Sequence, residues 1–309
     1  MSEVRHEPIR VWEEDGVRVI ECADCGFIHV DPIPTKDKLL TFYEQRYYKD
    51  VKPFNYEITP EYKENVLQQV STNLFYQGIY NHVNKLLPLD RPRTQRMLDI
   101  GCGNDLLAKY FSIQGWNAEA LEPSKDAAKY LREFGLVVHE IFAEEINELK
   151  LEEISFVNIQ FVLEHISDPI SLLKEVYDVM TPGGVVRICV PNDFSDGQLA
   201  YREYYNEKLR WVVQPDHINY FSFSSLNSLL SKCGFKEVYR TTNFPLEFLL
   251  LGGMNYYTDE EQQKKVGPFI QQFEQAFAKA GKWEKLLQLY GALAHLELGR
   301  SVYMFAIKR

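Results

Sequence analysis

The sequence lacks an apolar run long enough to cross a membrane. Its longest such run, residues 244–254, is interrupted by Glu247 and by two glycines, whereas a spanning helix needs about 20 apolar residues. The first ten residues also contain no apolar core of the kind found in secretory signals. We therefore expect a cytoplasmic protein with no membrane partner.

Cysteine and basic charge are also scarce. Five cysteines, an odd number, do not favour a disulfide framework in a chain of 309 residues. The 34 Lys and Arg residues are outnumbered by 44 Asp and Glu residues, which gives a formal net charge of −10. Because such a surface repels a phosphate backbone, we expect no nucleic-acid partner.

Short apolar runs alternate with helix-like patterns from about residue 96 onward. This alternation is typical of an α/β fold built around a parallel sheet. The best-marked helices are one that follows Asp168 and Pro169 and one that begins near Ser224. The expected strands are 97–100, 118–121, 137–139, 156–160, 185–190, 235–241 and 301–307.

The pattern divides the chain into two parts. Residues 1–50 form a ribbon-like segment, with a predicted hairpin around Glu14-Asp15-Gly16. Residues 51–309 form the α/β domain, which carries a helical insertion at about 245–298. That insertion could be a lid, the face of a homodimer or simply packing, and the sequence does not choose among them.

The strongest site signal is a glycine turn after the first expected strand of the sheet. Gly101 and Gly103 let the backbone bend sharply and approach a ligand closely. Glu122 lies 19 residues beyond Gly103, at the end of the next strand, where a carboxylate can accept both hydroxyls of an adenosine ribose. The turn therefore predicts a site for an adenosine cofactor.

The charge of the turn favours one such cofactor. A dinucleotide site would have glycine where this chain has Leu106, and its pyrophosphate would be repelled by Asp99 and Asp105. S-adenosylmethionine carries an ammonium and a sulfonium and no phosphate, so an acidic turn suits it. A nicotinamide-dependent oxidoreductase remains the less favoured alternative.

Five segments, in this order, resemble class I S-adenosylmethionine-dependent methyltransferases. The resemblance covers about residues 95–245 and the last strand, and it implies a Rossmann-like seven-stranded sheet whose last strand is antiparallel. The fold class that we expect is therefore α/β, with a small N-terminal hairpin region and a helical insertion before the last strand. The segments are LDIGCG at 98–103, LEPS at 121–124, FAEE at 142–145, FVLEHISDP at 161–169 and TPGGVVRICVPN at 181–192.

The resemblance also implies roles for individual residues around the cofactor. Asp99, Gly101 and Gly103 would line its methionine end, and Glu122 would hold the ribose. The adenine would be bordered by Phe142, Ala143 and Glu144, and the transferring methyl group would lie above Gln160 and Phe161.

One residue departs from the family pattern. Asp105 stands where members commonly have a third glycine. It could pair with the ammonium of the cofactor or cap a helix that begins at Leu106. A third alternative is that the change weakens cofactor binding, which would fit a non-catalytic S-adenosylmethionine-binding protein.

Two histidines are candidate catalytic bases. His165 follows the fourth expected strand, where the substrate of such enzymes meets the cofactor, and His217 lies in a segment that borders the acceptor pocket in similar families. Either could instead only stabilise its loop. We expect a small-molecule acceptor, through a hydroxyl or a carbon of a sugar or secondary metabolite.

No metal is expected in this chain. Some relatives bind one through Glu-x-x-Glu-His, but the first glutamate of that set is Phe161 here. Other relatives, including some sugar methyltransferases, have an N-terminal zinc ribbon with two Cys-x-x-Cys pairs. This chain has only Cys22 and Cys25, and His6 and His29 do not restore the usual spacing, so we expect a hairpin without its metal.

Overall fold

The computed structural model describes residues 6–42, 57–90 and 95–309, and the predicted domain boundary at residue 50 lies outside these ranges. The chain divides into two compact units. The N-terminal unit comprises residues 1–33, 189–229 and 239–304, and the central unit comprises residues 34–188, 230–238 and 305–309.

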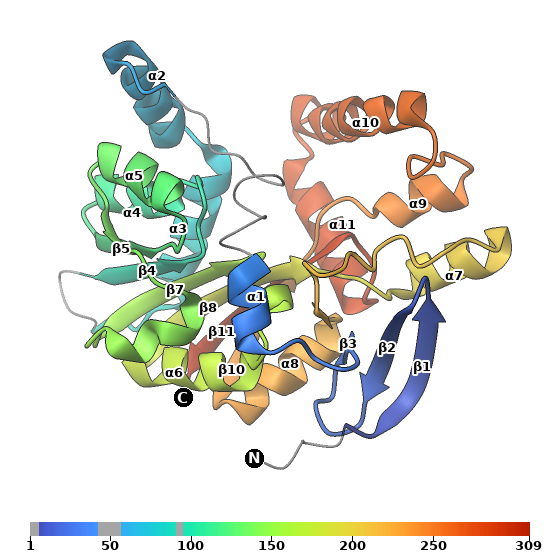
Figure 1. Cartoon of the computed structure of the whole chain (residues 1–309). Coiled ribbons are helices and arrows are strands. Elements are labelled where there is room, and N and C mark those ends of the chain that lie inside the picture. The colour runs from blue at the N-terminus through green and yellow to red at the C-terminus, as the bar shows by residue number, and fades with distance from the viewer. Residues whose placement is uncertain (1–5, 43–56, 91–94) are drawn as a thin grey trace. The chain divides into compact units, whose positions relative to one another are not determined.

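The larger sheet has seven strands and is mixed, with an antiparallel final strand, as the resemblance implied (Figure 1). Residues of β8, β10 and β11 belong to both units. In spatial order the strands are β10 (Phe235–Thr241), β11 (Ser301–Lys308), β8 (Met180–Pro191), β7 (Ile154–Gln160), β4 (Arg96–Ile100), β5 (Asn117–Leu121) and β6 (Val137–His139).

Neighbouring parallel strands of the central unit end at the same edge of this sheet. In β4, Ile100 pairs with Leu121 of β5 on one side and with Ile159 of β7 on the other. The apolar side chains of β4 are fully buried, which fixes this register, because a slip by one residue would turn them toward the opposite face. The segments that follow these three strands therefore start close together.

Helices cover both faces of the sheet in the central unit. Figure 1 shows α3, α4 and α5 on one face and α6 on the other. Phe111 of α4 stacks on Phe156 of β7, with 5.1 Å between ring centroids, in the core beneath α3, α4 and α5. The helices are α1 (Lys36–Phe42), α2 (Pro60–Ser71), α3 (Leu74–Leu86), α4 (Leu107–Ile113), α5 (Lys125–Glu133) and α6 (Pro169–Val179), with short 3-10 turns η2 (Ala143–Glu148) and η3 (Leu163–His165).

Helix α6 begins as its sequence predicts. The Asp168 carboxylate accepts the backbone N–H of Ser171 at 3.0 Å, and Pro169 occupies the first helical position, where its missing N–H has no cost. The end differs from the expectation. The strand expected at 185–190 already begins at Met180, directly after the helix, so β8 includes Thr181-Pro182-Gly183-Gly184.

A four-stranded antiparallel sheet forms part of the N-terminal unit. Its order is β1 (Pro8–Glu14), β2 (Val17–Cys22), β3 (Ile28–Val30) and β9 (Asn219–Tyr220). The predicted hairpin is confirmed, since Asp15 and Gly16 join β1 to β2 with positive φ angles of 51° and 80°. Two central residues with positive φ give the turn that matches the twist of a hairpin.

The predicted helical insertion is confirmed as well. Residues 245–298 contain α9 (Leu246–Leu251), α10 (Glu260–Lys279) and α11 (Trp283–His295), and Phe244 packs with Leu286 and Tyr290 in a small apolar core of this region. The remaining helices are α7 (Asp196–Tyr205) and α8 (Phe223–Lys232). In the described ranges, no helix combines the length and the apolar character that a membrane span requires.

Candidate functional site

The glycine turn after β4 uses positive φ at two glycines. The φ angles are 64° at Gly101 and 57° at Gly103, and the Gly101 N–H donates to the Leu121 carbonyl at 2.7 Å. A Cβ atom on Gly101 would lie 2.5 Å from Cγ2 of Val162, so no side chain fits there. A Cβ atom on Gly103 would meet nothing within 4 Å. The turn therefore packs against the segment after β7 and leaves open space beside Gly103.

Glu122 is buried and fixed by two backbone hydrogen bonds. Its Oε2 accepts the N–H of Gly103 at 2.7 Å and its Oε1 accepts the N–H of Ser124 at 2.9 Å. These bonds tie the end of β5 to the glycine turn. Each carboxylate oxygen has two lone pairs, so Glu122 retains the capacity to accept ligand hydroxyls.

Asp105 supports the start of α4. Its Oδ1 accepts the N–H of Leu107 at 2.8 Å, and the helix begins at that residue. Asp105 is not among the described residues with a positive φ angle. The backbone of this turn therefore does not require a glycine at position 105, where family members commonly have one. The hydrogen bond from Leu107 to Asp105 is the kind that a helix cap forms. Pairing of Asp105 with the ammonium of the cofactor stays a prediction.

A buried polar chain runs across three strands beneath the turn. Asp99 Oδ1 accepts from Asn158 Nδ2 at 2.6 Å, and Asn158 Oδ1 accepts from Arg187 Nη1 at 2.6 Å. Arg187 Nη1 also donates to Gln160 Oε1, at 3.0 Å. Burial, and then the nearby Asp105 carboxylate, raise the pKa of Asp99 to about 8. The sequence analysis missed Asn158 and Arg187, although an arginine inside the apolar run of β8 is itself a signal of a buried charge.

Ionisation of Asp99 should make the cofactor-free protein less stable as the pH rises. The folded-state pKa of about 8 lies above the ordinary aspartate value of about 4, so the native chain holds this proton more tightly than the unfolded chain. The stabilisation is complete below about pH 4 and is lost as the pH rises through about 8. We expect the melting temperature to fall over that range, and to fall less steeply for Asp99→Asn. Coincident profiles for the two proteins would contradict this account.

The expected adenine-side residues lie at the start of η2, after β6. Glu145 Oε2 accepts the N–H of Phe142 at 3.1 Å, which closes the turn, and Ala143 is buried. Burial raises the pKa of Glu144. Phe142, Ala143 and Glu144 are therefore consecutive residues on one hydrogen-bonded turn.

Phe161, directly after β7, has a strained backbone. Its φ angle is 55°, in a region that favours glycine, and its side chain remains 43% exposed. Such strain costs about 1–3 kcal/mol and is often found at functional sites. The neighbouring Gln160 is held by Arg187.

The two candidate bases lie in different units. His165, in the central unit, ends η3, and its backbone N–H donates to the Val162 carbonyl at 2.9 Å. His217 lies in the N-terminal unit, with Nδ1 at 3.9 Å from Oδ2 of the buried Asp193. Asp193 Oδ1 also accepts from Arg300 Nη1 at 2.6 Å.

The aromatic residues close to His217 in the sequence are of two kinds. Tyr201, Trp211 and Tyr220 are buried, whereas Tyr204 and Tyr205 are exposed. Phe194 lies between two of the buried rings, with centroid distances of 5.6 Å to Trp211 and 5.2 Å to Tyr220. At least three of these side chains thus pack in the core of the N-terminal unit.

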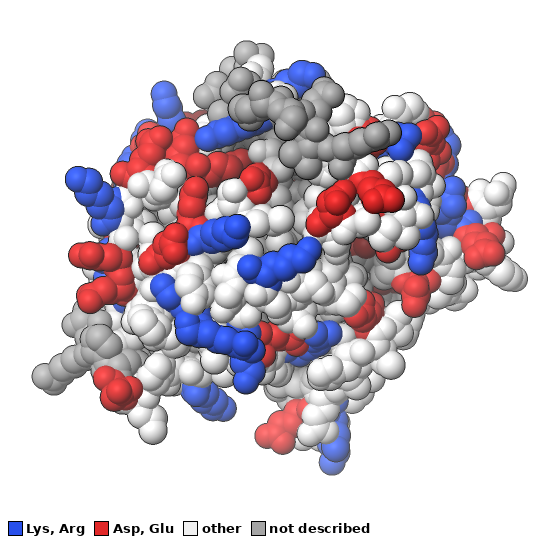
Figure 2. Space-filling view, turned by 90° about the horizontal axis from the view of Figure 1, so that it is seen from below, with Lys and Arg blue, Asp and Glu red and all other residues white. Residues whose placement is uncertain are grey.

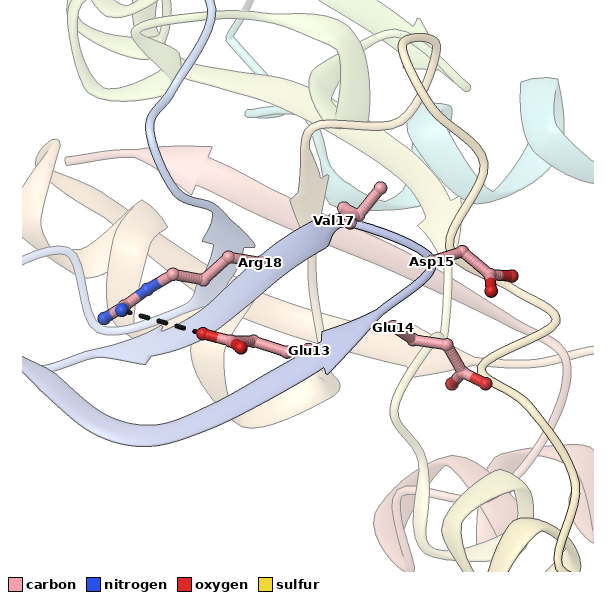
Figure 3. A pocket seen from close by; sticks show the side chains of 6 residues that line it. Glu13, Glu14, Asp15, Val17 and Arg18 are labelled. Atoms are coloured by element: carbon pink, nitrogen blue, oxygen red, sulfur yellow. Dashed lines mark ion pairs between the residues drawn. The ribbon is translucent and has the colours of Figure 1, made fainter.

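A separate hollow of about 370 Å³ lies at the turn of the β1–β2 hairpin and is lined by residues 13–18 (Figure 3). Glu13 and Arg18 form an exposed ion pair there, at 3.9 Å. The lining contains acids and one arginine but no histidine, cysteine or serine, so its chemistry gives no reason to regard it as a reaction site. On the face drawn in Figure 2, acidic and basic side chains are intermixed.

Alanine at Gly101 and at Gly103 should have different effects. The contact with Val162 Cγ2 at 2.5 Å, added to the positive φ, should cost Gly101→Ala about 2–5 kcal/mol of folding free energy. Gly103→Ala meets open space, so only the backbone strain of about 1–2 kcal/mol applies, while the new methyl group occupies the space expected for the cofactor. Thermal unfolding and calorimetric titration with S-adenosylhomocysteine would measure both effects. The reverse order of stabilities would contradict the geometry.

A family model for a methyltransferase domain matches residues 74–239, more than half of the chain. The chain belongs to this family. It contains a methyltransferase domain of the class I, S-adenosylmethionine-dependent kind. The match supports an S-adenosylmethionine-dependent methyltransferase over a nicotinamide-dependent oxidoreductase.

Curated relatives match a segment of 98 residues of this chain. The ubiquinone biosynthesis O-methyltransferase of Pseudomonas savastanoi pv. phaseolicola is 30% identical over 98 residues, which cover 30% of this chain and 42% of that protein. The enzyme of the same name from Methylococcus capsulatus is 31% identical over 98 residues, with 30% and 41% coverage. The chain thus spans about two fifths of the length of these relatives.

A solved structure shares the fold, and a second one is similar over part of the chain. The Haemonchus contortus phospholethanolamine N-methyltransferase 2, in complex with phosphomonomethylethanolamine and S-adenosylhomocysteine, is 15% identical, covers 97% of this chain and 71% of its own, and has a TM-score of 0.51. A SAM-dependent methyltransferase from Archaeoglobus fulgidus is 17% identical, with 79% and 99% coverage and a TM-score of 0.48.

The residues around the glycine turn suit this cofactor. The site combines open space beside Gly103, a fixed carboxylate at Glu122 and two further acids, Asp99 and Asp105. The carboxylates of Glu122 and Asp105 complement an ammonium and a sulfonium, and no basic residue among these contacts would call for a phosphate.

Proposed function

We propose that this methyltransferase transfers a methyl group to a hydroxyl of a small molecule, such as a sugar or a secondary metabolite. The observation that carries the proposal is the contact between the glycine turn and the segment after β7. Val162 touches the Cα side of Gly101, and His165 is anchored to Val162 through its backbone. A potential base is thereby held on the same short segment that abuts the expected cofactor site.

The cofactor, when bound, supplies an electrophilic methyl group on a cationic sulfur. The ten residues that we assign to its binding surround the edge where β4, β5, β6 and β7 end. In this assignment Glu122 accepts the ribose hydroxyls, and Asp99, Gly101 and Gly103 line the methionine end. The ten residues are Asp99, Gly101, Gly103, Asp105, Glu122, Phe142, Ala143, Glu144, Gln160 and Phe161.

The proton of the acceptor hydroxyl goes to a histidine in this proposal. His165 accepts it on a ring nitrogen as the methyl group moves, since an imidazole that titrates near neutral pH can take a proton and return it to water. His217 is the second candidate for this role. The name of the curated relatives, an O-methyltransferase, supports oxygen rather than carbon as the accepting atom.

A panel of acceptors tests the proposal. The purified protein would be incubated with S-adenosylmethionine and with sugars, phenols and catechols, and release of S-adenosylhomocysteine would be measured by mass spectrometry. We expect turnover with a hydroxyl acceptor, and a product whose new methyl resonance has the chemical shift of an ether. A product methylated on carbon or nitrogen would contradict the proposal, and so would turnover that a His165→Ala, His217→Ala double variant retains in full.

A further inference from the structure

Four potential metal ligands converge at one end of the small sheet in the N-terminal unit. They are His6, Cys22, Cys25 and His29, and each offers one donor atom within 4.8 Å of the others. His6 precedes β1, Cys22 ends β2, Cys25 lies in the following turn, and His29 is in β3. Cys22 and His29 are buried, and Cys22 and Cys25 do not form a disulfide with each other.

The strand register explains how distant residues meet. Pro8 of β1 pairs with Cys22 of β2, so His6 lies just beyond the paired end of the hairpin. His29 of β3 pairs with Ile20, two residues before Cys22 and on the same face of the strand. The spacing of the histidines in sequence is unusual for a zinc ribbon, and the fold nevertheless brings them to the cysteine pair.

The separations fit a tetrahedral ion. His6 Nδ1 lies 3.5 Å from Cys22 Sγ and 3.4 Å from Cys25 Sγ. Zinc bonds of about 2.0 Å to nitrogen and 2.3 Å to sulfur, in tetrahedral geometry, place neighbouring ligand atoms about 3.3–3.8 Å apart. The donors around His6 therefore already have the spacing that a bound ion requires.

The turn between the cysteines directs backbone donors toward sulfur. The Cys25 N–H donates to Cys22 Sγ at 3.4 Å, and the Gly26 N–H donates to the Cys22 carbonyl at 2.9 Å. Gly26 has a φ of 81°, which lets the chain turn back after Cys25. The surroundings of a metal ligand commonly hydrogen-bond it in this way and fix its orientation.

His29 is oriented as a ligand. Its Nδ1 lies 2.7 Å from the Val30 carbonyl, which can only accept, so Nδ1 carries the hydrogen and Nε2 has the lone pair of the neutral ring. That Nε2 atom is buried and has no hydrogen-bond partner among the residues that the structure describes. A metal-bound histidine commonly donates its other N–H to a backbone carbonyl in this way.

We propose that His6, Cys22, Cys25 and His29 bind one Zn²⁺ ion. Two thiolates and two neutral imidazoles neutralise the ion and fill all four tetrahedral positions, which leaves none for water or substrate and makes the site structural. The ion joins the residue before β1 to β2 and β3. This proposal replaces the expectation of a metal-free hairpin, which rested on the missing second cysteine pair.

Metal analysis of the purified full chain tests the site. With reductant and without chelator, we expect one zinc per chain in the wild type and background levels in Cys22→Ser and in His29→Ala. The matched controls Cys233→Ser and His295→Ala alter a cysteine and a histidine outside the cluster and should keep the zinc. Titration of S-adenosylhomocysteine on the same samples reports the cofactor site separately, so a failure of one site is distinguishable from a failure of the other.

Cobalt substitution of the wild type keeps the proposal testable even if the variants do not fold. We expect tetrahedral d–d bands in the visible and a thiolate-to-cobalt charge-transfer band in the near ultraviolet. The thiols of Cys22 and Cys25 should become reactive toward a thiol reagent when a chelator removes the metal. The proposal is overturned if the wild type binds neither zinc nor cobalt, if both ligand variants retain zinc, or if Cys22 and Cys25 form a disulfide in the protein purified with reductant.

Discussion

Replacing Arg187 with leucine should destabilise the methyltransferase by about 3–5 kcal/mol. The guanidinium is 1% exposed and donates to both Asn158 and Gln160. Its removal leaves the buried oxygen of Asn158 and the half-buried oxygen of Gln160 without this donor, and it removes the positive charge that lowers the pKa of Asp99. Urea unfolding of the cofactor-free protein, followed by fluorescence, measures the loss.

An exposed arginine provides the control. Arg10 forms an ion pair with Glu21 at 3.1 Å, and its side chain is 66% exposed, so Arg10→Leu should change stability by less than about 1 kcal/mol. Arg187→Lys should fall between the two, because a lysine keeps the charge but offers fewer donors in a different geometry. If Arg187→Leu and Arg10→Leu lowered the free energy of unfolding by the same amount, the buried polar chain would not stabilise the fold.

Replacing His165 with alanine should lower kcat by about 10²–10⁴-fold, which is the usual contribution of a positioned general base. The side chain contributes little to the expected cofactor contacts, so the Kd of S-adenosylmethionine should change little. The acidic limb of the pH profile of kcat should also disappear, since the base that must be deprotonated for activity is removed. Steady-state kinetics on the acceptor found in the panel, together with calorimetry, measures these quantities.

Two further variants separate a base from a structural residue. His295 is exposed in the last turn of α11, so His295→Ala should leave kcat unchanged. If His217→Ala shows the large loss instead of His165→Ala, then His217 is the base. A loss with an unaltered pH profile would mean that His165 only maintains the segment after β7.

The features that the sequence predicted best depend on local patterns. The strands end where apolar runs stop, and α6 begins at Asp168 because a carboxylate and a proline there satisfy the first turn whatever surrounds them. The glycine turn was also predictable, because Gly101 adopts a backbone that other residues rarely populate.

Features that depend on contacts between distant strands were missed. Arg187 reaches Asp99 only through Asn158 on the strand between β4 and β8, and no local pattern encodes such a chain. The same holds for His6 and Cys22, which are 16 residues apart and meet through the β1–β2 register. Position 105 shows the reverse case, since family members commonly have glycine there and yet the φ angle of Asp105 is not positive.

Calorimetric titration with S-adenosylmethionine tests the central claim, that the acidic glycine turn and Glu122 bind this cofactor. The wild type should bind it and not NADH, and Glu122→Gln, with its folding verified by thermal unfolding, should bind about 10–100-fold more weakly because a charged acceptor for the ribose hydroxyls is lost. Equal affinity of the wild type and of Glu122→Gln for S-adenosylmethionine, or binding of NADH alone, would contradict the account.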